Sequence, residues 1–269
     1  MNKKEGRDFD SVLFAQAMDE HLSSLRYASM IQRSLMPDTS FLSGILKDHF
    51  IIYLPKDYVS GDFYYAYQNA GYTIIAAGDC TGHGVPGALL SILGISFLNE
   101  ILQARIVPRA NRILNRMREK VMDALDQRGQ EYEQKDSIDI ALCVYDPYRS
   151  VIQFAGANRP LIMVSDGELK EIKPDKMPIG VAPLEERSFT NHRIEVKEGD
   201  RFYMFSDGYP DQFSEETNKK FKIRNFRQLI AHASDWSMER QKGHIEDIFH
   251  DWKGSAIQVD DVLVMGFEI

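Results

Sequence analysis

Hydrophobic residues along most of this chain fall in short runs separated by turn-forming residues, which is the pattern of β-strands. These runs predict strands at residues 50–53, 59–66, 72–77, 138–145, 151–155, 161–164, 168–172, 189–196, 201–205 and 258–267. Helical spacing predicts helices at residues 86–102, after Pro108, and at 225–232 and 238–252. Strands joined mostly by hairpins, with helices grouped in blocks, indicate an α+β fold with antiparallel sheets. The first of these helices, at residues 86–102, is very apolar. A β-sandwich with helices packed outside it would cover that helix.

The start of the chain predicts one long helix, because residues 10–35 contain neither proline nor glycine. A heptad seam with polar interruptions runs along it, and its apolar members are Phe14, Met18, Leu25, Ala28 and Leu35. The helix either lies on its own domain or pairs with a second copy of the chain, and we expect a homodimer. Pro37 ends the helix, and residues 38–43 read as a connector. We therefore divide the chain into a linker and dimerisation helix at 1–43 and one domain at 44–269.

Composition narrows the class of protein. The chain has 269 residues, 43% of them hydrophobic, and a formal net charge of −8, which supports a real core and argues against a nucleic-acid partner. Its two cysteines, Cys80 and Cys143, allow neither a disulfide framework nor a thiolate zinc site. The N-terminus lacks the apolar core of a signal peptide, and no run approaches the roughly 18 apolar residues of a membrane span. We expect a soluble cytoplasmic chain, which could be the output domain of a larger sensor.

One glycine-rich stretch lies between a predicted buried strand and the most apolar helix. Residues 78–87 (GDCTGHGVPG) contain four glycines and one proline. The stretch is not a Walker phosphate loop, because no Gly-Lys-Ser/Thr closes it, and its glycine spacing does not match the dinucleotide-binding fingerprint. Asp79, at the strand end, is either a cap for the turn or a ligand held at the edge of the core. In the second case the glycines would let backbone groups approach whatever Asp79 binds.

Further aspartates occupy the same kind of position, at strand ends and mostly beside a glycine. They are Asp62, Asp207 and the pair Asp260 and Asp261. Carboxylate and carbonyl oxygens suit Mg²⁺ or Mn²⁺, whereas zinc would need His and Cys ligands that are missing here. Two such ions about 3.5–4 Å apart can activate a water and clamp a phosphoryl group for in-line displacement. Each aspartate alone could be a cap or a turn residue, but together they favour a metal site.

Five segments carry these acids and their surroundings in a fixed order. They are residues 57–64 (DYVSGDFY), 78–84 (GDCTGHG), 154–158 (FAGAN), 206–208 (SDG) and 260–262 (DDV). In this order they resemble the motifs of bacterial SpoIIE/RsbU-type serine/threonine phosphatases, a branch of the metal-dependent type-2C phosphatases. The resemblance begins at about Ser29, because residues 28–37 also resemble the helix end that precedes these domains. It implies a central β-sandwich of two mostly antiparallel sheets flanked by helices, with two Mn²⁺ or Mg²⁺ ions at one edge.

The resemblance also implies a role for each matching residue. Asp79 would bridge both metals, and the backbone carbonyl of Cys80 would add a ligand. Asp207 and Asp260 would hold one metal. Asp62 would act near the other metal, directly or through water, so that Asp79 and Asp62 are the expected catalytic residues.

Some positions depart from the pattern of these relatives. The last motif often ends in Asp-Asn in relatives, which makes Asp261 a weaker candidate ligand than the residue before it. Cys80 stands where many relatives have glycine, and Ala157 replaces a histidine common in this branch. Thr81 stands where eukaryotic type-2C enzymes have a histidine. His83, two residues later, is therefore given no general-acid role and is expected to pack or to bind substrate.

The predicted activity is hydrolysis of phosphoserine or phosphothreonine on a bacterial signalling protein, such as an anti-sigma-factor antagonist. The identity of that substrate rests on the resemblance alone. One alternative is a catalytically silent relative that binds a phosphoprotein without cleaving it, although the filled acid positions argue against this. Another alternative is a metal-dependent phosphomonoesterase of small molecules. Turnover of a phosphopeptide compared with a sugar phosphate would separate these functions.

Overall fold

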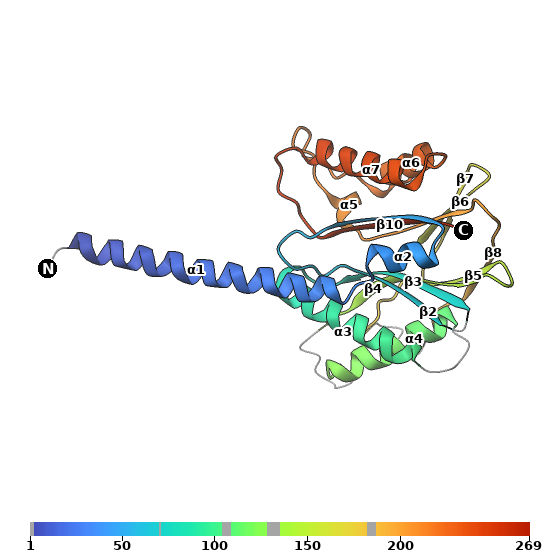
Figure 1. Cartoon of the computed structure of the whole chain (residues 1–269), viewed down its shortest axis with the longest axis horizontal. Helices are drawn as coiled ribbons and strands as arrows, with labels where there is room; N and C mark the ends of the chain where they lie inside the picture. The colour runs from blue at the N-terminus through green and yellow to red at the C-terminus, as the bar shows by residue number, and fades with distance from the viewer. Residues whose placement is uncertain (1–2, 70, 104–108, 128–134, 182–186) are drawn as a thin grey trace.

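The structure is a computed structural model that describes residues 3–69, 71–103, 109–127, 135–181 and 187–269 (Figure 1). Side chains are described from Phe14 onward. In Figure 1 a long N-terminal helix leads into a layered body, in which the strands lie between two groups of helices. This arrangement confirms the predicted α+β sandwich flanked by helices.

Two five-stranded sheets form the centre of the body, with the orders β1-β10-β9-β6-β7 and β2-β3-β4-β5-β8. The strands are β1 Asp48–Leu54, β2 Phe63–Asn69, β3 Tyr72–Cys80, β4 Ile138–Asp146, β5 Val151–Ala157, β6 Leu161–Ser165, β7 Glu168–Ile172, β8 His192–Glu195, β9 Arg201–Phe205 and β10 Val262–Glu268. All of their described pairings within the sheets are antiparallel. Each predicted strand is therefore present, although some of the boundaries differ.

Three strands begin later than their apolar pattern predicts: β8 begins at His192 instead of residue 189, and the other two follow acidic motif residues. The strand predicted from residue 59 begins at Phe63, because side chains occupy the backbone amides before it. The amide of Ser60 donates to Gln32 Oε1 (3.0 Å), and the amide of Gly61 donates to Asp261 Oδ2 (2.7 Å). The strand predicted from residue 258 likewise begins at Val262. Both shifts leave an acidic residue just before a strand rather than within it.

The inner faces of the two sheets pack together and form the central core. Side chains alternate between the two faces of a strand. In β3, Ile75 and Ala77 therefore point into the sandwich, where residues such as Leu263 of β10 surround them. Ile74 and Ala76 point to the opposite face and belong to the core under the helices. β3 is thus buried on both faces, which holds its end firmly at the edge of the sheet.

Helices cover the outer face of each sheet (Figure 1). On the outer face of the β2–β8 sheet lie α3 Gly84–Leu102 and α4 Ala110–Ala124, and on the other sheet lie α5 Gly208–Asp211, α6 Ile223–Ala233 and α7 Met238–Lys253. By length and composition alone, α3 could cross a membrane, and it is the one described helix that could. The prediction that no apolar run approaches the length of a membrane span is therefore wrong for α3. Its apolar character fits a core helix, since 50% of its 18-residue apolar window is buried inside the body.

The N-terminal helix α1 spans Lys3–Ser34 and extends away from the body for most of its length (Figure 1). It begins earlier than predicted, and it contacts the body through its last turns. There the buried Gln32 donates from Nε2 to the carbonyl of Ser60 (2.5 Å) and to Ser91 Oγ (2.7 Å). The C-terminal end of the predicted seam therefore lies on its own domain.

The predicted connector after α1 is wrong in part, because it contains a short helix. This helix, α2, spans Thr39–Ile45. Asp38 caps it, since its side chain accepts a hydrogen bond from the amide of Phe41 (2.8 Å). The side chain of Leu42 is buried in the core between the sheets. A helix of this length has too little periodic pattern to be separated from a loop by sequence alone.

Candidate metal centre

β3 ends at the edge of the sandwich and places Asp79 at its penultimate position. The residue directly opposite, on β4, is Asp139. Two carboxylates facing each other across strands repel unless a cation lies between them. Sequence analysis missed Asp139, although an acid within the apolar segment 138–144 was a signal for it. Asp79 is not the cap of the helix that follows, because the N-cap position of α3 is His83.

The cation that faces these carboxylates is Arg159, which sequence analysis also missed. Its Nη2 atom lies 2.6 Å from Asp79 Oδ2, 2.7 Å from Asp207 Oδ2 and 3.5 Å from Asp139 Oδ2. It belongs to the turn that leads from β5 in one sheet to β6 in the other. Asn158 in this turn has a left-handed backbone (φ 56°) and donates from Nδ2 to Asp139 Oδ1 (2.8 Å). The turn thus supplies a charge and an amide to the same acidic cluster.

Asp207 follows β9 and occupies the N-cap position of α5, yet its side chain makes no capping hydrogen bond. Its carboxylate is instead turned towards Arg159. The next residue, Gly208, packs so closely on the backbone carbonyl of Asp261 that a Cβ would collide with it. Glycine is therefore required there, which explains the Ser-Asp-Gly motif at this turn.

Asp62 lies behind the cleft, where only 2% of its surface is exposed. Its Oδ2 accepts a hydrogen bond from Ser206 Oγ (2.6 Å), and Ser206 Oγ accepts one from the amide of Leu263 (2.9 Å). Ser206 therefore ties together the start of β2, the end of β9 and the start of β10. Asp62 is held in one orientation beside the carboxylates of the cleft.

The acid pair before β10 divides into two different environments. Asp261 uses both carboxylate oxygens on backbone amides, since Oδ1 accepts from Lys56 and Oδ2 from Gly61, each at 2.7 Å. Asp260 instead lines the cleft, and its Oδ1 accepts a hydrogen bond from the amide of Asp261 (2.9 Å). Asp261 thus fixes the loop before Asp62, while Asp260 faces the open space.

These residues surround a cleft with a volume of about 230 Å³. Its lining residues are Asp79, Cys80, Thr81, Gly82, Ser137, Asp139, Arg159, Asp207 and Asp260. The Cys80 side chain is buried, and burial raises the pKa of its thiol, which disfavours a reactive thiolate. His83 is not among the lining residues, and its Nδ1 lies 3.3 Å from Asp57 Oδ2 at the exposed surface.

Burial raises the pKa of several carboxyl groups here because it disfavours their charged form. It raises the pKa of Asp79 to about 7; Arg159 opposes this shift and the neighbouring carboxylates add to it. Burial also raises the pKa of Asp62 well above its usual range, and the charge of Asp79 contributes. The pKa of Asp139 is raised by burial too. One guanidinium therefore does not compensate the negative charge that the fold gathers at this edge.

The donor chemistry of the cleft fits a hard divalent cation. Every candidate donor is a carboxylate or carbonyl oxygen, the type that Mg²⁺ and Mn²⁺ prefer. The guanidinium of Arg159, itself a cation, lies between Asp79 and Asp207. Among the residues that the structure describes, however, no three His, Cys, Asp or Glu side chains are arranged to hold a metal ion as they stand. The donors are thus present, but they converge on a guanidinium.

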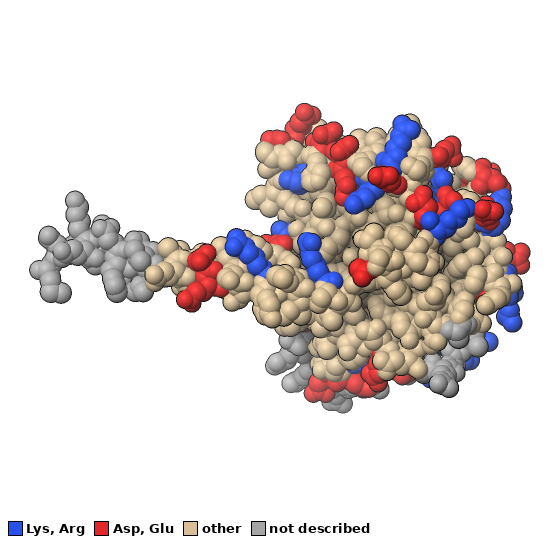
Figure 2. Space-filling view, viewed as in Figure 1, with Lys and Arg blue, Asp and Glu red and all other residues tan. Residues whose placement is uncertain are grey.

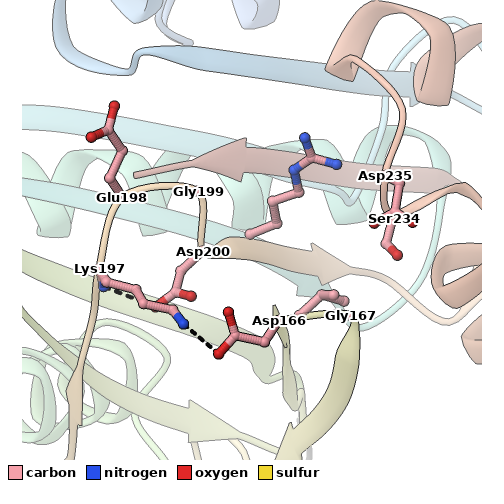
Figure 3. Close-up of a pocket in the computed structure, with 10 residues that line it drawn as sticks. Asp166, Gly167, Lys197, Glu198, Gly199, Asp200, Ser234 and Asp235 are labelled. Carbon is pink, nitrogen blue, oxygen red and sulfur yellow. Dashed lines mark hydrogen bonds and ion pairs between the residues drawn. The ribbon is translucent and has the colours of Figure 1, made fainter.

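A second polar hollow, of about 310 Å³, lies at the opposite end of β9 (Figure 3). Lys197 pairs there with Asp166, as a dashed line in Figure 3 shows. Arg201, the first residue of β9, pairs through Nε with Glu268 Oε2 at 2.9 Å. The lining of this hollow is also acidic, with Asp166, Glu198, Asp200 and Asp235 beside the two cations, but each cation here pairs with one carboxylate, whereas Arg159 faces three.

Comparison with known families decides which family this is. The family described as Stage II sporulation protein E (SpoIIE) matches residues 69–269. The chain belongs to the SpoIIE family. The matched part of this SpoIIE-family chain contains Asp79, Asp207 and Asp260, while Asp62 lies just before it. The family resemblance that the motifs predicted is therefore confirmed.

Solved structures agree with this assignment. The SiaA-PP2C domain of Pseudomonas aeruginosa is 30% identical, with a TM-score of 0.85 over 95% of this chain and 99% of that chain. The PP2C phosphatase domain of SpoIIE from Bacillus subtilis, with a fragment of its regulatory domain, is 19% identical, with a TM-score of 0.64 over 82% of this chain and 63% of that chain. No curated protein sequence matches the chain.

A more distant structure shows the same fold together with metal. It is the catalytic domain of the serine/threonine protein phosphatase PstP in complex with 2 manganese ions. It is 14% identical, with a TM-score of 0.56 over 82% of this chain and 97% of that chain. The SpoIIE-family chain is homologous to PP2C-type phosphatase domains such as that of SiaA, as its motifs predicted.

Proposed function

We propose that this chain is a metal-dependent protein phosphatase that hydrolyses phosphoserine or phosphothreonine on a signalling protein with two Mn²⁺ or Mg²⁺ ions. The observation that carries the proposal is the convergence of Asp79, Asp139, Asp207 and Asp260 on one cleft. A phosphate monoester is an anion, and uncompensated carboxylates would repel it. Divalent cations bound to these carboxylates would reverse the sign of the cleft and so make it able to bind the substrate.

The metal ligands would be Asp79, Asp207 and Asp260, with the backbone carbonyl of Cys80 as a further oxygen and Asp62 acting directly or through water. When bound, the ions would neutralise the phosphoryl oxygens and activate a water for in-line displacement. This assignment is supported by the positions of four of these residues in the cleft lining and of Asp62 directly behind it.

Other residues of the chain would hold these oxygens in position. Ser206 orients Asp62 through its hydroxyl, and Asp261 fixes Gly61, the neighbour of Asp62, through its amide. Contacts of this kind fix the direction of metal ligands. Among the described residues that line the cleft, Arg159 is the one cation. Its guanidinium lies where a phosphoryl group entering the cleft would meet it.

A protein substrate is supported by the relatives, since SpoIIE from Bacillus subtilis is described as a cell fate determinant with a regulatory domain. By analogy we propose a cytoplasmic substrate such as an anti-sigma-factor antagonist, with this chain as the output domain of a larger sensor. We propose no nucleic-acid partner. On the face shown in Figure 2, acidic and basic side chains are interspersed over α6 and α7 rather than gathered by sign.

We also propose that the chain forms a homodimer through α1. Large apolar side chains on this helix are exposed, including Phe14 (69%), Tyr27 (66%) and Met30 (67%). Figure 2 shows uncharged surface between the charged side chains along the helix. Pairing with the same helix of a second copy along the predicted seam would bury its exposed members Phe14 and Met18 (44%). A chain mass that stays monomeric at all concentrations in solution would contradict this dimer.

Substrate class is tested by comparing hydrolysis of a phosphoserine peptide with that of a sugar phosphate, each with and without added Mn²⁺. We expect Mn²⁺-dependent turnover that favours the phosphopeptide. Faster turnover of the sugar phosphate would identify a small-molecule phosphomonoesterase instead. Binding of the phosphopeptide without turnover, at saturating Mn²⁺, would identify a silent binding module.

A further inference from the structure

Arg159 joins carboxylates that come from different sheets. Asp79 belongs to β3 and Asp207 follows β9, and a single atom, Nη2, contacts both. The side chain of Arg159 is only 14% exposed. The carboxylates raise the pKa of this guanidinium although burial opposes its charge, so it is charged at any physiological pH. It is thus a fixed positive charge within the acidic cluster.

The oxygens that Arg159 contacts are those that a metal would need. Asp79 Oδ2 and Asp207 Oδ2 both accept hydrogen bonds from it, at 2.6 and 2.7 Å. Hydrogen bonds between charged groups are among the strongest in proteins, so a metal must break them to use the same oxygens.

We propose that Arg159 is an internal counter-ion that competes with the metal for Asp79 and Asp207. It balances these carboxylates when no metal is bound, and it leaves them when metal binds. Arg159 is therefore a positioning residue that weakens and gates metal binding. The inference rests on the proposed function, because it assumes that these acids are metal ligands.

The backbone of Arg159 is fixed by local contacts, whereas its side chain is held by its ion pairs. Its amide donates to the carbonyl of Ala157 (2.7 Å), and Pro160 restricts the next backbone angle. The Nε atom is buried and has no hydrogen-bond partner. A buried donor without a partner costs free energy, so the present position of the guanidinium depends on its carboxylates. When a divalent ion takes over Asp79 and Asp207, the longer contact with Asp139 Oδ2 (3.5 Å) is the ion pair that remains.

The test is calorimetric titration of Mn²⁺ into the metal-stripped full chain. Arg159→Gln removes the charge, Arg159→Lys keeps it, and Arg201→Gln removes a comparable, largely buried arginine at the other end of β9. We expect Arg159→Gln to bind Mn²⁺ at least about tenfold more tightly than the unaltered chain, because no ion pair must be broken. Arg159→Lys should fall closer to the unaltered chain, and Arg201→Gln should match it.

Thermal unfolding supplies a second readout that does not depend on activity. Without metal, Arg159→Gln should unfold at a lower temperature, since its carboxylates have lost their counter-ion. Saturating Mn²⁺ should raise its unfolding temperature more than it raises that of the unaltered chain. Equal or weaker Mn²⁺ binding by Arg159→Gln would overturn the inference while leaving the metal site intact. If neither chain bound Mn²⁺, the proposed function itself would fail, together with the inference.

A measurement on the unaltered chain covers the case in which Arg159→Gln does not fold. The Nε–H resonance of Arg159 in a ¹⁵N-labelled chain can be assigned by its absence from the spectrum of Arg159→Lys. Titration with diamagnetic Mg²⁺ should shift this resonance in step with metal binding and leave that of Arg201 unchanged. A resonance that stays in place at saturating Mg²⁺ would show that the guanidinium does not move, which would contradict the proposal.

Discussion

The two ends of β9 differ in how their charges are balanced. At its start, Arg201 pairs with one carboxylate, that of Glu268, and also donates to the carbonyl of Trp236 (3.0 Å). Beyond its end, Arg159 faces Asp79, Asp207 and Asp139 at once. Both arginines are largely buried, so burial alone does not separate a structural pair from a functional cluster. What separates them is the number of carboxylates that meet one arginine, which is one at the start of β9 and three beyond its end.

Removing one of the carboxylates that meet Arg159 should have the largest effect on Mn²⁺ affinity. Loss of a residue that merely orients a ligand typically lowers metal affinity about 10–100-fold. Asp207→Asn removes a proposed ligand itself and should lower Mn²⁺ affinity by at least about a hundredfold. Asp166→Asn, at the other end of β9, breaks only the pair with Lys197 and should leave the affinity unchanged. Equal losses in the two variants would remove the distinction between the ends.

Removing the Ser206 hydroxyl behind the cleft should have a smaller effect on Mn²⁺ affinity. Ser206→Ala leaves Asp62 and the amide of Leu263 without a buried partner, so the free energy of unfolding should fall by about 1–3 kcal/mol. Mn²⁺ affinity should fall about 10–100-fold, since Asp62 loses its orientation. Ser234→Ala, at the other end of β9, is the control because Ser234 donates only to the nearby carbonyl of Ala231. An unchanged affinity in Ser206→Ala would show that Asp62 needs no such support.

The smallest change in Mn²⁺ affinity is expected from a shift of one pH unit. In the folded chain without metal, burial raises the pKa of Asp79 from 3.8 to about 7. Between these values the folded chain binds more protons than the unfolded chain, so the free energy of unfolding falls as the pH rises. Metal binding has the opposite dependence, because the metal must replace the proton. Mn²⁺ affinity should therefore rise about tenfold per unit up to pH 7, as titrations between pH 5 and 8 would show.

Much of the fold could be predicted because its signals are local. The strands carry apolar runs bounded by turn residues, and the glycine-rich stretch after β3 marks the point where Asp79 leaves the sheet. The segments with Asp62, Asp207 and Asp260 share the same local pattern. α2 escaped prediction because its helical pattern is too short. The strand that follows Asp62 was predicted to begin too early because distant side chains occupy the amides of Ser60 and Gly61 before it.

Two members of the site were missed because their roles depend on long-range pairing, even though the acid in the apolar segment 138–144 marked one of them. Asp139 faces Asp79 only through the register of β3 with β4, which the sequence does not specify. Arg159 reaches the cluster because the turn after β5 crosses between the sheets. The different environments of Asp260 and Asp261 likewise arise from the amides of Lys56 and Gly61, which are remote in sequence. Only their position in the fold shows these roles.

The central claim is that the acids around Asp79 form a metal site that drives phosphate-ester hydrolysis. The most direct measurement is the Mn²⁺ stoichiometry of the metal-stripped chain, read beside hydrolysis of a generic phosphate ester, in the unaltered chain and in Asp79→Asn. The account predicts two ions for each unaltered chain with Mn²⁺-dependent turnover, and loss of both binding and turnover in the variant. Turnover without added metal, or an Asp79→Asn variant that binds Mn²⁺ and turns over normally, would contradict it.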